Sequence, residues 1–194
     1  MILASIRYNL ANLLHFSGRE NRALFWPYAI AVVLMDFIAM FAMMVPAMSE
    51  SLARMQRFAA AHPDQATVES GPGHYSISIQ GYHPELMPDM SPLLAGVAVV
   101  ALVTVVVVGA AVARRLHDRG RRGWWGLLPL PFLGIALTME PRMFAGFGSG
   151  HPDMALFMAM FFNNLLYLAS LAILVVLLAG DGVKGPNRFD ARAT

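Results

Sequence analysis

The chain has 194 residues, of which 57% are hydrophobic and only 13% are charged, whereas a soluble domain carries about 25% charged residues. There are too few charged residues to cover the surface of a core built from so many apolar residues. This composition excludes a soluble monomer, a disordered chain and a coiled coil. The formal net charge is +2, and the lack of cysteine excludes disulfides and thiolate chemistry.

Residues 1–16 predict an amphipathic helix at a membrane interface, within a cytoplasmic amphipathic segment of residues 1–23. The apolar side chains recur at intervals of three and four, which places them on one helical face, and Arg7, Asn9 and Asn12 lie on the other. A helix with this pattern is expected to lie flat in the cytoplasmic interface. Docking onto the underside of a helix bundle explains the pattern equally well.

Four segments predict membrane-spanning helices. Residues 24–47, 92–113 and 155–179 are each 22–25 residues long, and about 20 residues suffice to cross a bilayer. Residues 124–139 number only 16 and contain Pro129 and Pro131, which predicts a short, kinked span that begins with interfacial tryptophans; a re-entrant segment is the alternative. The expected fold is therefore an all-α integral membrane protein, a four-helix transmembrane bundle in a single domain.

The distribution of positive charge predicts the orientation. Eleven of the 14 Lys and Arg residues fall in residues 1–23, 114–123 and 180–194. Because positive charge stays on the cytoplasmic side, both termini and the 114–123 loop are expected there. Residues 48–91 and 140–154 are then outer loops. The first apolar segment is too long for the core of a signal peptide, so we expect it to be retained.

The larger outer loop carries two local patterns. Leu52, Met55 and Phe58 predict a short amphipathic helix, and the alternation of Tyr75, Ile77 and Ile79 after a Gly-Pro-Gly turn predicts a small hairpin. The loop is too short for an independent enzyme domain.

Residues 114–125 hold the most informative polar cluster. Five arginines in this stretch precede Trp124 and Trp125. Guanidinium groups bind phosphate and tryptophan prefers the interface, so this face is expected to bind anionic lipid headgroups or a protein partner. Obedience to the positive-inside rule alone is the competing interpretation, although it does not account for the embedded His117-Asp118 pair.

Three motifs resemble a known family. They run from Phe16 to Trp26, from Arg114 to Trp125 and from Gly185 to Phe189. In this order they resemble the domain-of-unknown-function 805 group, small bacterial inner-membrane proteins of the YhaH type. Arg122 and Asp190 depart from the family pattern, and the outer loop is longer than expected. The resemblance implies a location in the bacterial inner membrane and no established reaction.

All three motifs fall on the side predicted to be cytoplasmic. We therefore expect them to converge as one polar cluster beside the two tryptophans, which would either brace the bundle or bind a ligand. The candidate residues are Arg19, Arg22, Arg114, Arg115, His117, Asp118, Arg121, Trp124, Trp125 and Asn187.

Polar residues within the predicted spans suggest an alternative function. Asp36 lies in the first span, and Asn163 and Asn164 lie in the last. A small transporter or channel would use such groups, whereas a structural role would pair Asp36 with Thr104, Tyr167 or these amides. The Gly109–Ala113 pair is spaced for close helix packing within one chain or in a homo-oligomer.

No pattern in the sequence predicts an enzyme. The three histidines of the outer loop match no metal-ligand spacing, and no catalytic triad or phosphate loop is present. We expect no cofactor, no metal and no nucleic-acid partner, and a non-enzymatic protein is favoured over an enzyme acting on lipid headgroups.

Overall fold

The computed structural model describes residues 2–81, 83, 86 and 88–190. The described part is mostly helical. Its elements in chain order are α1 (Ile2–Ala11), α2 (Arg22–Ala61), β1 (Ala66–Gly71), β2 (His74–Ile79), α3 (Ser91–Asp118), the 3-10 helix η2 (Gly123–Leu127), α4 (Leu130–Gly148) and α5 (Met154–Ala179). Two helices begin at side-chain caps, because Asn21 accepts from the Leu24 N–H and Asp153 accepts from the Leu156 N–H.

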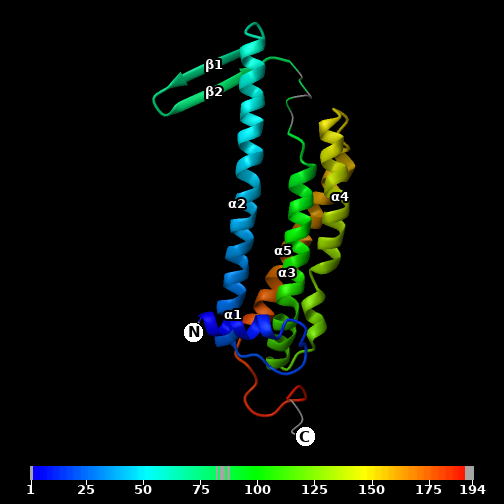
Figure 1. Cartoon of the computed structure of the whole chain (residues 1–194). Helices are drawn as coiled ribbons and strands as arrows, with labels where there is room; N and C mark the ends of the chain where they lie inside the picture. The colour runs from blue at the N-terminus through cyan, green and yellow to red at the C-terminus, as the bar shows by residue number, and fades with distance from the viewer. Residues whose placement is uncertain (1, 82, 84–85, 87, 191–194) are drawn as a thin grey trace.

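The helices α2, α3, α4 and α5 run along one long axis (Figure 1). The chain ascends in α2, descends in α3, ascends in α4 and descends in α5, so both ends of the chain lie at the same end of the molecule. We call this end the base. It also carries α1 and η2, whereas the hairpin lies at the opposite end, which we call the top.

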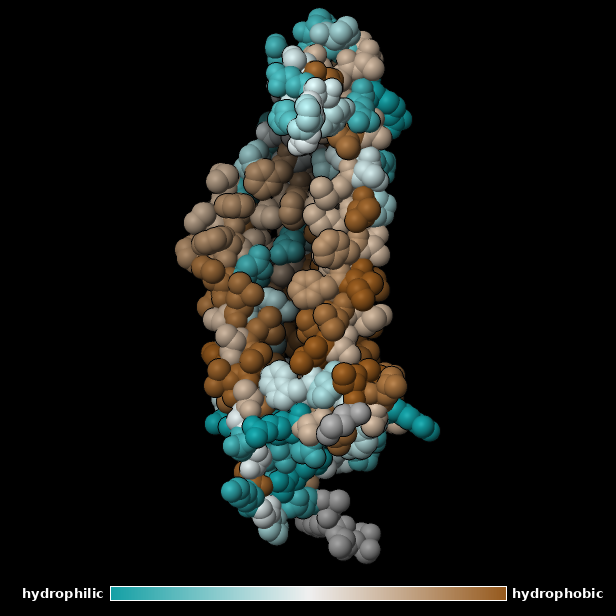
Figure 2. All heavy atoms as spheres, turned by 90° about the vertical axis from the view of Figure 1, so that its left-hand side faces the viewer, coloured by the Kyte–Doolittle hydropathy of each residue, from teal (hydrophilic) through white to brown (hydrophobic). Residues whose placement is uncertain are grey.

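Three of these helices, α2, α3 and α5, are long and apolar enough to cross a membrane. They coincide with the first, second and fourth predicted spans. Most of their large apolar side chains are exposed, for example Met35, Val106 and Leu168. Figure 2 shows this surface as a broad brown band between hydrophilic ends. Soluble monomers rarely expose so large an apolar area, so the surface fits a membrane protein.

The third predicted span, residues 124–139, differs from the helix that forms there. The chain first makes the 3-10 helix η2, and α4 begins only at Leu130 and continues to Gly148, into residues expected to be an outer loop. Proline supplies the physical reason: Pro129 is the N-cap of α4, and Pro131 lies in its first turn, where a missing N–H costs no helical hydrogen bond. The second half of α4 contains Glu140, Pro141 and Arg142, and α4 is not one of the three helices that are long and apolar enough to cross a membrane.

Of the two elements expected in the outer loop of residues 48–91, the hairpin forms, whereas the short helix is not separate from the first predicted span. The helix around Met55 is the continuation of α2, whose 40 residues extend for about 60 Å, twice the ~30 Å hydrocarbon thickness. The hairpin prediction is confirmed: β1 and β2 pair antiparallel from Ala66 opposite Ile79 to Gly71 opposite His74. Gly73 closes the turn with φ of 74°, which side-chain-bearing residues rarely adopt.

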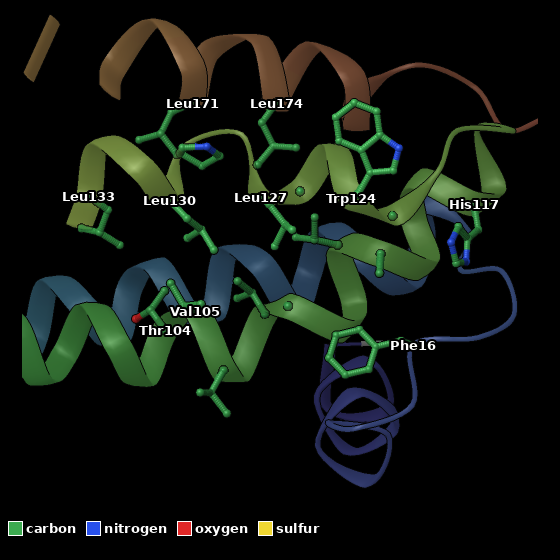
Figure 3. A pocket seen from close by; sticks show the side chains of 18 of the residues that line it. Phe16, Thr104, Val105, His117, Trp124, Leu127, Leu130, Leu133, Leu171 and Leu174 are labelled. Atoms are coloured by element: carbon green, nitrogen blue, oxygen red, sulfur yellow. The ribbon is translucent and has the colours of Figure 1, made fainter. Parts of the chain in front are cut away.

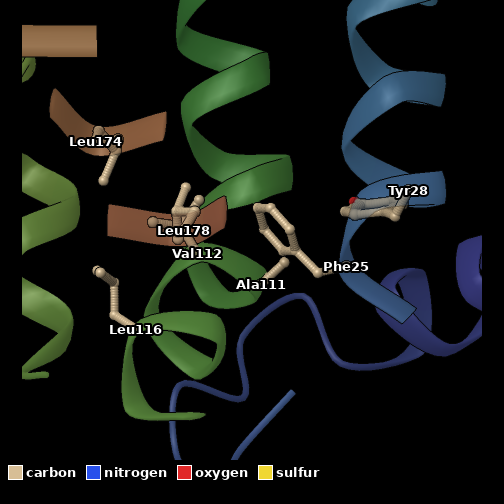
Figure 4. Packing of buried hydrophobic residues seen from close by; sticks show 7 residues of the cluster. All are labelled: Phe25, Tyr28, Ala111, Val112, Leu116, Leu174 and Leu178. Atoms are coloured by element: carbon tan, nitrogen blue, oxygen red, sulfur yellow. The ribbon is translucent and has the colours of Figure 1, made fainter. Parts of the chain in front are cut away.

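The buried core lies near the base. Phe25 and Tyr28 of α2 meet the last turns of α3 and α5, and Figure 4 shows Phe25 directed toward Ala111 and Val112. The Tyr28 hydroxyl donates to the Val107 carbonyl at 2.9 Å. Burial is therefore concentrated in the last two turns of α3, which hold the arginine motif.

The helix α1 packs against this core with an inverted polarity. Its polar residues Ser5 and Asn9 are buried, whereas Leu3 and Leu10 are exposed, and the Ser5 hydroxyl donates to the Leu24 carbonyl. The helix thus docks on the base through Ser5, Asn9 and the partly buried Ile6, whereas Leu3, Leu10 and Arg7 are exposed. An outward apolar face beside the brown band is what a helix in a membrane interface requires.

Candidate functional site: a buried polar cluster at the base

The arginines of the 114–125 motif differ sharply in exposure. Arg114 and Arg115 are each only 1% exposed, and their neighbours Glu20 and Asp118 are also buried. A buried charge is tolerated only when it is paired and hydrogen-bonded. The partners of these side chains therefore decide whether they are available to a ligand.

Arg114 has internal partners for all three of its guanidinium nitrogens. Its Nε donates to Glu20 at 2.9 Å, one terminal nitrogen donates to Asn9 at 2.6 Å, and the other donates to the Asn12 and His15 carbonyls. The Asn9 amide also donates to Glu20 at 3.0 Å. Arg114 therefore ties α1 and the following loop to α3, and it has no nitrogen left for a lipid phosphate.

Glu20 is the acidic member of this pair, and it is 1% exposed. Burial raises the pKa of its carboxyl group, and the hydrogen bond from Asn9 and the charge of Arg114 oppose that rise. Asn9 and Arg114 are the partners that compensate for the burial of this carboxyl group, which makes Glu20 dependent on Arg114.

Arg115 binds the C-terminal end of α5. Its Nε donates to the Leu178 carbonyl at 3.0 Å, and a terminal nitrogen donates to the Gly180 carbonyl at 2.6 Å. The third nitrogen forms a 2.5 Å ion pair with Asp118. The last carbonyls of a helix have no partners within the helix and carry partial negative charge, so a guanidinium satisfies them well.

Asp118 links this centre to Arg19 of the entry motif. Arg19 contacts Asp118 at 3.1 Å and Asp190 at 3.0 Å, and it donates to the carbonyls of Val183 and Gly185. The hydrogen bond to Asp190 is the main factor that raises the pKa of Arg19. A Cβ at Gly182 would overlap the Asp118 carboxyl group, so the tail passes this carboxylate only with glycine there.

His117 and Asn187 hold the C-terminal tail. The His117 ring bonds the Gly18 carbonyl at 3.1 Å and stacks on Phe189 with ring centroids 4.0 Å apart. The Asn187 amide donates to the His117 carbonyl at 3.0 Å. The backbone N–H of Asn187 donates to Asp190, and this bond is the main cause of the lowered pKa of Asp190. Asn187 and His117 therefore dock the tail, and they do not form an open site.

The other candidates lie outside this network. Arg22 is exposed and pairs with Asp181 at 2.8 Å. Arg121 and Arg122 are exposed, and within the described part of the chain neither guanidinium has a hydrogen-bond or ion-pair partner. Trp124 is 55% exposed and stacks on Trp125 with centroids 4.7 Å apart.

The sequence interpretation missed three members of the cluster: Asn9, Glu20 and Asp190. Glu20 had a usable signal, since it is the one acidic residue among residues 1–23 and lies within the entry motif. The pattern assigns Asn9 only to the polar face of its helix and marks Asp190 only as a departure from the family pattern, and neither observation indicates which cation the side chain binds.

The polar residues of the predicted spans are divided between two helix pairs. Asp36 of α2 accepts from Thr104 of α3 at 2.8 Å. On the other side, Asn163 of α5 donates to the Phe132 carbonyl of α4 at 3.0 Å, and Asn164 donates to Glu140 at 3.3 Å. No pathway joins Asp36 to the amides in these contacts, and each residue holds two helices together.

The fold and this cluster define a class: a helical protein with three helices long and apolar enough to span a membrane, whose basal end is joined by buried ion pairs. Among the described residues, no group of three His, Asp or Glu side chains gathers as a metal site. The chain belongs to the family described as "Protein of unknown function (DUF805)", whose model matches residues 13–191. No curated protein and no solved structure matches the chain.

Proposed function

We propose that this chain is a bacterial inner-membrane protein with four spans and cytoplasmic termini, and that its base binds anionic lipid headgroups without catalysing a reaction. The observation that carries the proposal is the contrast among the arginines. Arg114 and Arg115 are buried and hydrogen-bonded to partners within the protein, whereas Arg121 and Arg122 are exposed and lie close in sequence to the exposed Trp124. An arginine pair next to an interfacial indole suits a phosphate at headgroup depth.

Several features support the four-span arrangement. The chain reverses direction after each long helix, so α4 rises from the base and the antiparallel α5 returns the tail to it (Figure 1). With η2 included, residues 123–148 extend far enough to cross with the three longer helices. The apolar face of α1 and the stacked tryptophans lie at the same end, as an inner interface would require.

The absence of cysteine allows a direct test of the topology. Single cysteines placed at Ser70 in β1, Ser149 after α4 and Lys184 in the tail are all exposed. A membrane-impermeant maleimide added to intact cells with permeabilised outer membranes is expected to label S70C and S149C, and K184C only after lysis. Labelling of K184C in intact cells, with S149C labelled only after lysis, would contradict four spans and favour a re-entrant α4.

Lipid binding is tested by measuring retained lipid in purified protein. The wild type, extracted from membranes and washed in detergent, is expected to retain phosphatidylglycerol in preference to phosphatidylethanolamine when examined by native mass spectrometry. Arg121→Gln/Arg122→Gln should reduce that preference at least fivefold, because each cation contributes about 1 kcal/mol at a charged surface.

The matched control removes two arginines from the opposite end, Arg57→Gln/Arg142→Gln. Both residues are exposed, and the net charge changes by the same amount. This variant is expected to keep the preference of the wild type. If both variants lose the preference for phosphatidylglycerol equally, the preference depends only on the overall charge of the protein. If neither variant loses it, headgroup binding at the base is overturned.

The second function predicted from sequence, a small transporter or channel, gains no support from the contacts. Asp36 is hydrogen-bonded between α2 and α3, and the two asparagines are hydrogen-bonded between α4 and α5. Their pairing favours a structural role in helix packing.

A further inference from the structure

A groove of about 760 Å³ lies between α3 on one side and η2 and α4 on the other, with α5 contributing to its wall. Figure 3 shows Leu127, Leu130 and Leu133 in a row facing α3, with His117, Trp124 and Phe16 near one end and Thr104 toward the other. The volume falls within the ~300–1,000 Å³ typical of small-molecule sites.

The chemistry of the wall selects an aliphatic occupant. Most lining side chains are leucine or valine, and the polar exceptions are Thr104, Tyr167 and His117. Of these, Thr104 already donates to Asp36, and the His117 ring is bonded to Gly18. The Tyr167 hydroxyl and the Trp124 indole N–H are the few polar groups that this wall leaves for a ligand. A polar metabolite would therefore lose most of its hydration for few partners, whereas a hydrocarbon chain would lose nothing.

Small residues create the hollow. A Cβ built at Gly109 meets only the ring of Phe16, at 3.9 Å, so the space in front of Gly109 is open. At Gly126 the situation is opposite, because a Cβ there would lie 2.8 Å from Val112. Gly126 therefore lets η2 close tightly on α3, and Gly109 leaves room above that contact.

The length of the groove matches one leaflet. Along α3, His117 and Thr104 are 13 residues apart, which corresponds to about 20 Å at 1.5 Å per residue. Half of a ~30 Å hydrocarbon core is about 15 Å. An extended chain that enters at the base therefore fills the groove and ends near the middle of the membrane.

The charge at the basal end identifies the headgroup. Arg121 and Arg122 immediately precede Gly123 and Trp124, which line the groove. Both guanidinium groups are exposed, and guanidinium pairs bidentately with phosphate. A second copy of this chain fits less well, because a symmetric pair joined at this groove would place the same arginines near each other.

We propose that this groove is a binding site for one acyl chain of an anionic phospholipid whose phosphate lies at Arg121 and Arg122. The inference rests on the proposed headgroup binding and adds to it a specific, stoichiometric lipid held by α3, η2 and α4. The lipid would complete the helix packing on the side where α3 and α4 are separated.

The test fills the hollow without disturbing the polar cluster. Gly109→Leu places a side chain in the open space, and its matched control is Gly134→Leu in α4, where a Cβ meets nothing within 4 Å and which does not line the groove. Both proteins are reconstituted in vesicles of phosphatidylglycerol and phosphatidylethanolamine, re-extracted and examined by native mass spectrometry. The wild type and Gly134→Leu are expected to retain one lipid per chain, and Gly109→Leu is expected to retain at least fivefold less.

The outcomes separate the two proposals. Retention in Gly109→Leu equal to that of the wild type overturns the groove and leaves headgroup binding intact. A stoichiometric lipid that is lost in Gly109→Leu but shows no preference for phosphatidylglycerol supports the groove and overturns headgroup recognition. If Gly109→Leu instead converts a dimer to a monomer and loses no lipid, the groove is an interface between copies. A thermal unfolding curve for each variant identifies loss of fold, and a circular-dichroism spectrum unlike that of the wild type would move the test to Val106→Phe, at an exposed position that lines the same groove.

Discussion

Replacing Arg114 by methionine is expected to lower the free energy of unfolding by about 3–5 kcal/mol, the largest effect of any single substitution considered for this chain. The substitution keeps an unbranched stem in place of the arginine stem but leaves Glu20 buried without its cation, and it removes the bonds to the Asn12 and His15 carbonyls. Titration with a denaturing detergent, followed by tryptophan fluorescence, measures the loss.

Two further variants separate the ion pair from simple packing. Arg121→Met removes an exposed arginine and is expected to change stability by no more than about 0.5 kcal/mol. The double variant Glu20→Gln/Arg114→Met removes both charges and is expected to recover part of the loss, because no uncompensated charge remains. If Arg114→Met were as mild as Arg121→Met, the buried cluster would not hold the base together.

Replacing Arg115 by methionine is expected to cost about 2–4 kcal/mol and to release the end of α5 together with the tail. The reason is that the Leu178 and Gly180 carbonyls lose a charged donor, while Asp118 still keeps Arg19. Hydrogen exchange of residues 174–190 measures the release directly, since it reports the local opening of backbone hydrogen bonds.

Arg119→Met is the neighbouring control for this substitution. One terminal nitrogen of Arg119 is buried and has no hydrogen-bond partner in the described part of the chain. The Arg119 guanidinium also packs against Gly180, so Arg119→Met removes a packing contact but no hydrogen bond, and the exchange of residues 174–190 is expected to rise less than in Arg115→Met. Faster exchange in Arg119→Met than in Arg115→Met would show that charge near α5, and not the specific bonds of Arg115, protects that helix end.

The roles of the arginines separate what sequence can predict from what it cannot. The pattern of residues 114–125 predicted a cluster of cations at headgroup depth, and the contact of Arg19 with Asp118 lies within the group of motifs expected to meet. The sequence could not predict that Arg114 and Arg115 are saturated. Many of their partners are the backbone carbonyls of Asn12, His15, Leu178 and Gly180. Every residue has a backbone carbonyl, so the residue type does not indicate which carbonyls will accept these hydrogen bonds.

The helix α1 provides a second example. The spacing of its apolar residues predicted the amphipathic helix, but two placements fitted the pattern equally well. The contacts of Ser5 with Leu24 and of Asn9 with Arg114 place its polar face on the base. A hydrophobic pattern states which residues share a face, and only the surface that receives the helix decides which face is buried.

The sequence alone determined the long apolar helices, the hairpin and the family, because hydrophobic runs, strict alternation and ordered motifs are local properties of the chain. Tertiary structure decided where α4 begins, which arginines are buried, and that small residues on α3 face a groove. These features depend on how segments 60–170 residues apart pack against each other, as in the contact of Arg19 with Asp190. Burial and hydrogen bonding are properties of that packing, so the same arginine motif holds both the internal cations that join the base and cations that remain exposed.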